Sequence, residues 1–491
     1  MKRFFIVLII TIVSLSFLGC EKKDNIDEIC KDLSNYEINL ELDVETKSVS
    51  AKQKVNYINS TDNILKTIKF HLYPQFFEEG ATEFVIPNTK INNAYPNGMS
   101  YANFNVDRVQ VEDAEKPVIY EEEFDSILSV ELNSSLMPNE RVTLYFEYSF
   151  ALPNCNHRFG YGENTINLAN FYPIACVFEN DSFNTSGYHS NGDPFYSDMA
   201  NYCVNIKTDK QYIVAGTGNK TNEKIADGNK ILSFEAKLVR DFALVASNKF
   251  EIISQKLNNT NIEYYYFLDK NPENSLKAGV DAIKTFSKLF GEYPYSSFSI
   301  VECDFLYGGM EYPNLIMISS SIEDYDDYLN VIIHETAHQW WYGIVGNNEY
   351  VYPWLDEALT EYSTVLFYDN NDGYNFNHKQ MIEISKENYS IFISVYEDVL
   401  GPIDTSMRAV NEYNTEPEYT YCTYVKGVLM FESLRELIGE KCFIRGLKNY
   451  FENNKFTNST PEDLINSFEI ESKKELNNFF SSWVQGKVVI R

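Results

Sequence analysis

Two histidines that flank a glutamate are the side chains of this sequence best suited to chemistry. His334 and His338 are four residues apart with Glu335 between them, and eighteen further residues separate His338 from Glu357. Imidazoles at this spacing share one face of a helix, and with a carboxylate from a second helix they can bind a zinc ion. The spacing therefore predicts one zinc site whose three ligands come from two antiparallel helices.

Two more carboxylates, Glu335 and Glu361, complete the predicted site. Three protein ligands leave a fourth position for water, which zinc makes far more acidic than bulk water. Glu335, next to a ligand, is placed to accept the proton of that water as it attacks a carbonyl. Glu361 lies one turn beyond Glu357 and is either the hydrogen-bond acceptor of a ligating histidine or a solvated surface carboxylate. We therefore predict a zinc hydrolase with Glu335 as general base.

The surrounding residues predict the helices that carry these ligands. Tyr328 to Tyr342 is rich in apolar residues and free of Pro and Gly, and Gly343 follows where a helix end expects it. Pro353 opens a second run, 354–368, whose acidic first turn favours a helix start. Both runs are long enough to place two ligands, or a ligand and its neighbour one turn on, on a single face.

A double glycine lies ahead of the histidines. Gly308 and Gly309 separate the two apolar halves of residues 301–318, and Glu311 follows directly. Glycines permit close approach of another backbone, as when an extended peptide pairs with the edge of a sheet. A carboxylate beside such an edge could bind a cationic amino terminus. The alternative interpretation is a hairpin turn with an exposed glutamate.

Together these motifs resemble the aminopeptidase N family of gluzincin zinc metallopeptidases, peptidase family M1. The segments that carry the resemblance are 308–311, 334–341 and 355–358. Further similar segments are 195–198, 240–243, 290–294 and 424–427. The likeness spans about residues 35–485.

The resemblance implies a role for each matching residue. The implied ligands of one Zn²⁺ per chain are His334, His338 and Glu357, with Glu335 as the general base. The implied substrate-binding residues are Gly308, Gly309, Met310 and Glu311, of which Glu311 would hold the free amine of a peptide. Tyr424 would donate a hydrogen bond to the oxyanion of the tetrahedral intermediate, and Tyr419 and Tyr421 are the alternatives.

Two departures from the family pattern affect these expectations. Tyr312 stands where the family usually has Asn after the glutamate. The large helical domain that many members carry after the catalytic domain has no counterpart before Arg491. The resemblance therefore implies a short form with a more open cleft, which a partner or a second copy of the chain could close.

The periodicity of the sequence predicts a multidomain α+β protein. Segments such as 36–42 and 142–146 alternate apolar and polar residues, which predicts a largely antiparallel β domain over about residues 35–252. After Asn274 the period becomes helical, with strands near the double glycine and helices thereafter. The resemblance implies a saddle-like β domain followed by a thermolysin-like catalytic domain, 253–491, with a helical C-terminal half.

The first residues predict export and lipid anchoring. Lys2 and Arg3 precede an apolar run that is short for a bilayer span, which is typical of a secretory signal. Residues 17–20 resemble a bacterial lipoprotein box. We predict a signal peptide over 1–19, acylation of Cys20, a tether over 20–34, and a location on the outer face of the cytoplasmic membrane. An uncleaved membrane anchor is the alternative.

Charge and cysteine content limit the partners. A net charge of -30 argues against nucleic acid or anionic lipid, both of which need basic patches. Apart from Cys20, seven cysteines are widely spaced and predict no disulfide framework. The expected partners are peptides with a free amino terminus. Two rival hypotheses stay open: a zinc endopeptidase with the same chemistry, and a non-catalytic surface lipoprotein that binds peptides.

Overall fold

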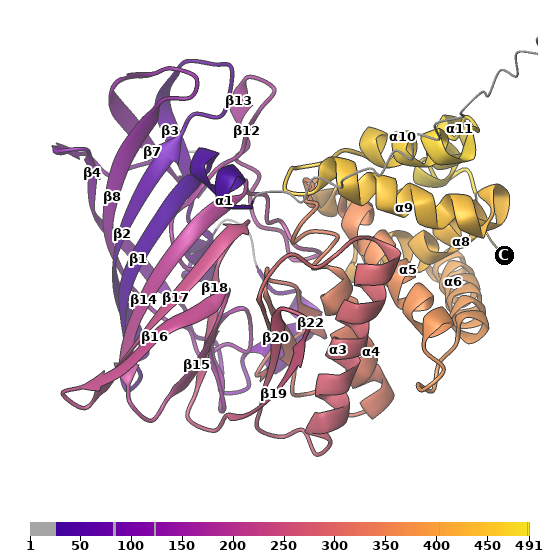
Figure 1. Cartoon of the computed structure of the whole chain (residues 1–491), viewed down its shortest axis with the longest axis horizontal. Coiled ribbons are helices and arrows are strands. Elements are labelled where there is room, and N and C mark those ends of the chain that lie inside the picture. Colours follow the sequence, from indigo (N-terminus) through magenta and orange to yellow (C-terminus); the bar gives the residue numbers. More distant parts are fainter. Residues whose placement is uncertain (1–25, 82–84, 122–123, 402, 489, 491) are drawn as a thin grey trace, which may run out of the picture.

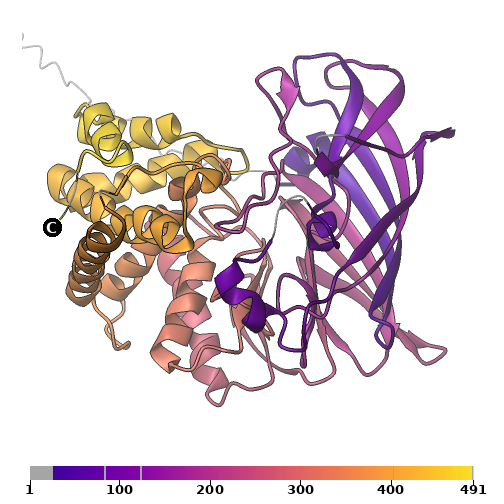
Figure 2. The same ribbon diagram turned by 180° about the vertical axis from the view of Figure 1, so that it is seen from behind.

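The protein consists of a β-rich N-terminal half and a helical C-terminal half that lie side by side (Figures 1 and 2). The computed structural model describes residues 26–490 apart from 82–84, 122–123, 402 and 489. The predicted signal peptide, 1–19, and the predicted lipidation site, Cys20, lie outside the described residues. The predicted order of a β domain followed by a helix-rich domain is confirmed.

A large twisted sheet forms the outer wall of the N-terminal half. Its eight strands run in the order β16 (Asn219–Ala226), β17 (Asn229–Val239), β14 (Ala200–Asp209), β1 (Ser34–Asp43), β2 (Ser48–Ile58), β8 (Arg141–Ala151), β4 (Asn103–Val111) and β5 (Ala114–Lys116). Alternate residues of β1, β2 and β14 are buried, as the polar–apolar alternation of the sequence predicts. The sheet is antiparallel except that β1 and β14 pair in parallel, from Ser34 opposite Ala200.

Smaller sheets cover the inner face of this wall. One contains β15 (Ile213–Gly216), β18 (Ala243–Ser247), β10 (Ile166–Ala169) and β9 (Phe159–Tyr161). Another contains β11 (Ile174–Ala175), β3 (Leu65–His71), β7 (Phe124–Leu136) and β6 (Ile119–Glu121), and a hairpin joins β12 (Phe178–Glu179) to β13 (Ser182–Phe183). The layers enclose one apolar core rich in aromatic side chains, among them Phe70, Phe146 and Tyr172.

The C-terminal half begins with a mixed sheet. Its strands run in the order β19 (Glu251–Leu257), β20 (Thr260–Tyr266), β21 (Ser297–Cys303), β23 (Leu315–Ser319) and β22 (Gly309–Met310). β20, β21 and β23 are parallel, whereas the short β22 pairs antiparallel with β23 at the edge. The predicted strands around the double glycine are therefore confirmed, and the second glycine lies on the edge strand.

Helices form the remainder of this half. The longer ones are α3 (Pro272–Leu289), α4 (Tyr325–Ala337), α5 (Pro353–Asn370), α6 (His378–Leu400), α8 (Lys426–Ile438), α9 (Glu440–Asn454), α10 (Pro461–Ser472) and α11 (Asn477–Val484). Short helical segments are α1 (Ile26–Ile29), α2 (Ile91–Ala94), α7 (Glu416–Thr420), η1 (Cys30–Asp32), η2 (Tyr73–Phe77), η3 (Asn88–Lys90) and η4 (Val410–Glu412), and a π-helical turn, η5, spans Tyr421–Val425.

Local sequence accounts for where the central helices start. Asp324 caps α4 because its carboxylate accepts hydrogen bonds from the backbone N–H groups of Asp326 and Asp327. Pro353 is the first residue of α5. A backbone N–H at this position would have no acceptor within the helix, so proline loses no hydrogen bond here. The predicted second helix, 354–368, is confirmed within these bounds.

The first predicted helix is wrong at its C-terminal end. The expected run to Tyr342 stops at Ala337, and His338 is the capping residue. The chain then turns sharply: Tyr342 has a φ of 115°, and Trp341 forms an isolated bridge with Val345. The apolar residues after His338 that suggested a longer helix, such as Trp340 and Trp341, are buried by this turn.

Arg240 and Asp241 join the two halves next to the ligand helix. The buried Arg240 guanidinium donates hydrogen bonds to the carbonyls of Ser197 and Tyr342, and Asp241 accepts one from the Tyr342 hydroxyl. A Cβ on Gly346 would overlap the same guanidinium, so this position requires glycine. The β domain thereby fixes the turn that follows His338.

Two further observations on helices and cysteines apply to the described residues. No helix in this part of the chain combines the length and apolar character needed to cross a membrane. Its seven cysteines are all free: Cys30, Cys155, Cys176, Cys203, Cys303, Cys422 and Cys442.

Candidate active site

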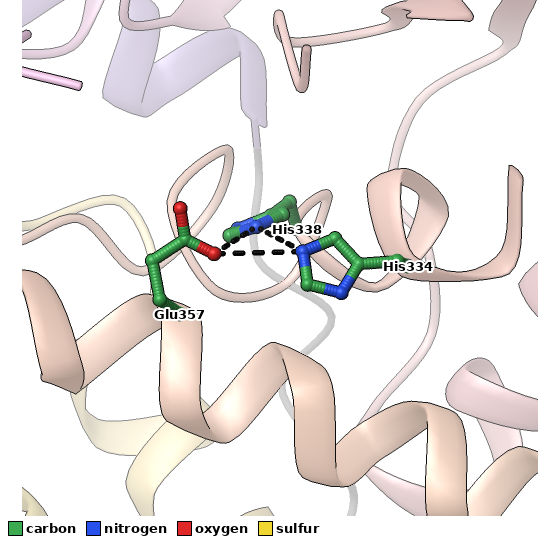
Figure 3. A group of neighbouring side chains, drawn as sticks. All are labelled: His334, His338 and Glu357. Carbon is green, nitrogen blue, oxygen red and sulfur yellow. Dashed lines mark hydrogen bonds and ion pairs between the residues drawn. The ribbon is translucent and has the colours of Figure 1, made fainter. Parts of the chain in front are cut away.

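His334 from the last turn of α4, His338 at the C-cap of that helix and Glu357 from α5 point toward one another (Figure 3). The Nε2 atoms of His334 and His338 are 3.2 Å apart. Glu357 Oε2 lies 3.4 Å from the first of these nitrogens and 3.2 Å from the second. The two helices therefore bring the predicted ligand atoms into one small triangle.

The triangle has the dimensions of a zinc site. Ligand atoms at about 2.0 Å from a tetrahedral zinc ion are about 3.3 Å apart, which is the spacing of these three atoms. Two imidazole nitrogens and one carboxylate oxygen are also a donor set that zinc accepts. The residues present therefore fit the metal in both geometry and chemistry.

Hydrogen bonds fix the orientation of each candidate ligand. Glu361 Oε2 lies 2.8 Å from His334 Nδ1, and the Trp341 carbonyl lies 2.9 Å from His338 Nδ1. In the neutral tautomer that carries its proton on Nδ1, each ring donates to its oxygen and leaves the Nε2 lone pair facing the triangle, as a metal ligand requires. The structure thus brings Glu361 to the position of the acceptor that the sequence suggested.

Electrostatics favour a cation between these atoms. Burial lowers the pKa of His338, but the carboxylates of Glu311 and Glu357 outweigh burial and raise it to about 10. Burial alone would raise the pKa of Glu357, yet His338 and His334 hold it well below its ordinary value. The carboxylates thus favour a positive charge between the ligand atoms, and a divalent ion would supply it.

Glu335 lies beside the triangle, on the side of the edge strand. Burial raises the pKa of Glu335 to about 7, against the opposing effect of the nearby histidines. Its Oε2 atom is buried and has no hydrogen-bond partner among the described residues. A carboxylate with a pKa near neutrality and a free oxygen is suited to accepting and returning a proton.

Glu311 follows the edge strand and faces the same space. Its side chain is 3% exposed, and its Oε1 atom accepts no hydrogen bond within the described part of the chain. Burial raises the pKa of Glu311 well above its ordinary value. Glu311 lies near Glu335 and His338, with one ligand atom of each within 4.8 Å of the others. The alternative of an exposed glutamate in a hairpin turn is therefore wrong.

Tyr424 reaches the site from the π-helical turn η5. Its hydroxyl donates a short hydrogen bond to Glu357 Oε1, and its ring stacks on His334 at 6.3 Å between centroids. A Cβ on Gly427 would overlap Ala358, so the glycine lets α8 pack closely on α5. This close packing holds the tyrosine over the ligands.

A cavity of about 290 Å³ contains these groups. It is lined from the C-terminal half by the candidate ligands and by Glu311, Glu335 and Tyr424. The β domain contributes a second wall that includes Arg158, Tyr188 and Asp193. The candidate site therefore lies between the two halves and is built by both.

The C-terminal half matches a known family. Residues 275–483 match the model of the peptidase family M1 domain. This segment is a peptidase family M1 domain. It includes both ligand helices and the tyrosine of η5, and the predicted resemblance to aminopeptidase N-like proteins is confirmed.

The relatives of this M1 domain are longer proteins. Aminopeptidase N of Haemophilus influenzae is 24% identical over 306 residues, which cover 57% of this chain and 34% of that protein. Aminopeptidase B of Rattus norvegicus is 29% identical over 208 residues, which cover 40% of this chain and 30% of that protein. The matched region thus spans about a third of the length of these relatives.

Solved structures share the fold over almost the whole chain. A mutant M1 zinc metallopeptidase from Deinococcus radiodurans has a TM-score of 0.66 at 16% identity, covering 94% of this chain and 96% of that one. The same match is found for that mutant bound to a Tyr-Ser-Ala substrate. The β domain followed by the M1 domain is therefore an arrangement with known examples.

Among the other predicted residues of the M1 domain, some line the cavity and others do not. Gly308 lines the cavity, whereas Met310 is fully buried and does not line it. Tyr419 lines the cavity, but Tyr421 stacks on Phe392 at 4.3 Å and lies outside the lining. The roles of these residues stay predictions.

Sequence reasoning missed the side chains that the β domain adds to the M1 domain. Asp193, Arg158 and Tyr188 line the cavity, and the first two form an ion pair. They lie in irregular segments that follow no period and match no motif. The one feature that marks them is the ion pair between a buried arginine and an acidic loop residue. This pair can be seen in the structure but not in the sequence.

Gly309 allows the edge strand to pass close to the general-base candidate. A Cβ at this position would overlap the carboxylate of Glu335, whereas one on Gly308 would lie 3.3 Å from Val331. We expect Gly309→Ala to displace Glu335 and to lower kcat/KM roughly 100-fold, since a displacement of about 1 Å can have that effect. Gly308→Ala, assayed under the same conditions, should lose much less. Equal losses in the two variants would contradict this account.

Proposed function

We propose that the protein is a zinc-dependent aminopeptidase that removes residues from the amino terminus of peptides. The convergence of His334, His338 and Glu357 on one point, beside the free carboxylate of Glu335, is the observation that carries the proposal. The position of Glu311 at the end of the edge strand supports the exopeptidase assignment.

Each side chain has a definite task in the proposed reaction. A zinc ion bound by the three ligand atoms would polarise the scissile carbonyl and make a water molecule nucleophilic at neutral pH. Glu335 accepts the proton of the attacking water and delivers it to the leaving amine. The Tyr424 hydroxyl, which donates to Glu357 in the absence of substrate, would donate instead to the oxygen that gains negative charge.

Substrate alignment follows from the edge strand. β22 pairs with β23 on one side only, so its outer backbone groups can pair with an extended peptide. Glu311, just beyond this strand, then accepts hydrogen bonds from the terminal ammonium of that peptide. Because Glu311 is buried and its Oε1 atom has no hydrogen-bond partner among the described residues, a substrate without a positive terminus would leave this carboxyl group unsatisfied.

The names of similar proteins support the same activity. The matched relatives include aminopeptidases from bacteria, plants and yeast, and one neighbouring structure carries a tripeptide substrate. These proteins share the M1 domain with this chain, although most of their length lies outside the match. They support the reaction and do not identify the preferred residue.

We also propose that the protein is held on the outer face of a bacterial cytoplasmic membrane. The support is the sequence alone: a short apolar leader that ends in a lipoprotein-like box at Cys20. Labelling cells with a radioactive fatty acid would test it, because Cys20→Ala should abolish incorporation into this protein.

The decisive assay compares free and blocked peptides. We expect the purified zinc-loaded protein to trim a mixed peptide library from the amino terminus, one residue at a time, and to leave amino-acetylated copies uncut. Mass spectrometry of the products reports both outcomes in one experiment. Internal cleavage of acetylated peptides would instead establish an endopeptidase, and no cleavage of either set would exclude peptidase activity.

A further inference from the structure

We propose that Glu349, Asp356 and Glu311 form a second cation site, which binds Ca²⁺ behind the wall of the cavity. The site is separate from the triangle of candidate zinc ligands, and the sequence did not predict it. This inference goes beyond the proposed function and does not depend on peptidase activity.

Three segments of the M1 domain bring these carboxylates together. Glu311 follows the edge strand β22, Glu349 lies in the turn that precedes α5, and Asp356 belongs to the first turn of α5. One carboxylate oxygen of each lies within 4.8 Å of the others. Glu311 is among the residues that line the cavity, whereas Glu349 and Asp356 are not. The cluster therefore extends from the cavity wall into the interior.

Glu349 is the side chain that points to a bound ion. It is 2% exposed, and neither of its carboxylate oxygens has a hydrogen-bond partner among the described residues. Glu311 Oε1 is buried and lacks such a partner as well. Burial of an acceptor without a partner is destabilising, so native proteins pair these groups with protein, water or an ion. The two oxygens of Glu349 can bind one cation together.

The donor set of this cluster favours a hard cation. All three residues offer carboxylate oxygens. Calcium prefers oxygen ligands at about 2.4 Å and binds carboxylates through one oxygen or both. Oxygens on opposite sides of such an ion are about 4.8 Å apart, so three oxygens within this distance fit around one Ca²⁺. Zinc instead favours the triangle, which supplies imidazole nitrogens.

The charge of the region also favours a second divalent cation. Six carboxyl groups lie in overlapping clusters beside the cavity: Asp193, Glu311, Glu335, Glu349, Asp356 and Glu357. Among the described lysines and arginines, Arg158 alone forms an ion pair with one of them. Zinc would add two positive charges, which still leaves an excess of negative charge. Burial and the neighbouring carboxylates of Asp356 and Glu311 raise the pKa of Glu349 well above its ordinary value, and a cation beside it would offset this effect.

The test measures calcium binding by the zinc-loaded protein, starting in calcium-free buffer. Calorimetric titration with CaCl₂ should show one site in the wild-type protein. Calcium at about 100 times its dissociation constant should raise the Tm by roughly 5 °C. The zinc content of the same sample should not change. In Glu349→Gln we expect both the calorimetric site and the rise in Tm to disappear.

The Tm values in the two buffers separate this role from a structural one. Gln fills the same space as Glu and removes one buried acidic group, so Glu349→Gln should be at least as stable as the wild-type protein without calcium. With calcium, the wild-type protein should be the more stable of the two. A variant that is less stable in both buffers and still gains Tm with calcium would overturn the proposal.

Two further variants complete the experiment, because a protein with a net charge of -30 can also attract calcium weakly to its surface. Glu292→Gln removes an exposed charge from the same half of the protein and should keep both the site and the rise in Tm. If Glu349→Gln does not fold, Asp356→Asn must lose both. Asn at this position can still accept the hydrogen bond from Asn347 but carries no charge.

The outcomes are independent of the proposed function. The absence of a calcium site in the wild-type protein would overturn this inference, and so would a site that persists in folded Glu349→Gln or Asp356→Asn. Failure of the zinc-loaded protein to trim peptides would instead overturn the proposed function and would leave the calcium site standing.

Discussion

The Glu335→Gln variant is expected to lose between about 100-fold and 10,000-fold in kcat while it retains its zinc. Gln fills the same space but cannot accept a proton, so the attacking water keeps its proton and the leaving amine receives none. Glu335 is not one of the three atoms of the ligand triangle, and metal binding should therefore persist. Steady-state kinetics on an amino-acid anilide, together with metal analysis of the same sample, measures both quantities.

The exposed Glu292 supplies a matched control on the same domain. Glu292→Gln removes the same charge far from the chemistry and should leave kcat unchanged. Loss of zinc in Glu335→Gln would show that Glu335 binds the metal, and full activity with zinc present would exclude it as the general base.

Replacing His338 by Ala is expected to lower zinc affinity by far more than 100-fold and to remove activity with it. The imidazole supplies one of three ligand atoms, and two remaining protein ligands cannot hold the ion in a closed tetrahedral site. Without the cation the buried carboxylates Glu311, Glu335 and Glu357 face one another, so we also expect a lower Tm. Competition with a fluorescent zinc chelator gives the affinity, and thermal unfolding gives the Tm.

A graded comparison strengthens this prediction. Glu361→Gln leaves all three ligands but weakens the hydrogen bond to His334, so its zinc affinity should fall only about 10- to 100-fold. Equal zinc content in wild-type protein and His338→Ala at limiting zinc would contradict the assignment of this ligand.

The sequence could bring together the three candidate zinc ligands because their signal is local. His334 lies in the last turn of α4 and His338 caps the same helix, while Pro353 marks the start of the second helix. Each ligand therefore lies where short-range periodicity places it. The predicted C-terminal end of the first helix was wrong. The turn after His338 depends on a hydrogen bond from Tyr342 to Asp241 of the β domain, which is a contact between distant segments.

Tyr424 and Asp193 show two different limits of the sequence. Tyr424 was identified only through a motif, because a π-helical turn has no sequence period of its own and nothing local distinguishes one tyrosine among 36. Asp193 carries no motif at all. Its place in the cavity depends on Asn191 and Gly192 docking on a segment more than two hundred residues later in the chain.

The alternation of apolar and polar residues likewise does not predict strand direction. Alternation of apolar and polar residues reports which face of a strand is buried, but it is the same for parallel and antiparallel neighbours. It therefore predicted the β domain and most of its pairing while giving no sign that β1 and β14 run in parallel.

That parallel pair governs when the β domain can assemble during synthesis. The first strand takes a central place between β2 and β14, so its second neighbour emerges from the ribosome only after some 160 further residues have been made. Until then the β1–β2 hairpin presents an open edge that invites association with other chains. Slow refolding and a need for chaperones at high expression levels are the expected practical results.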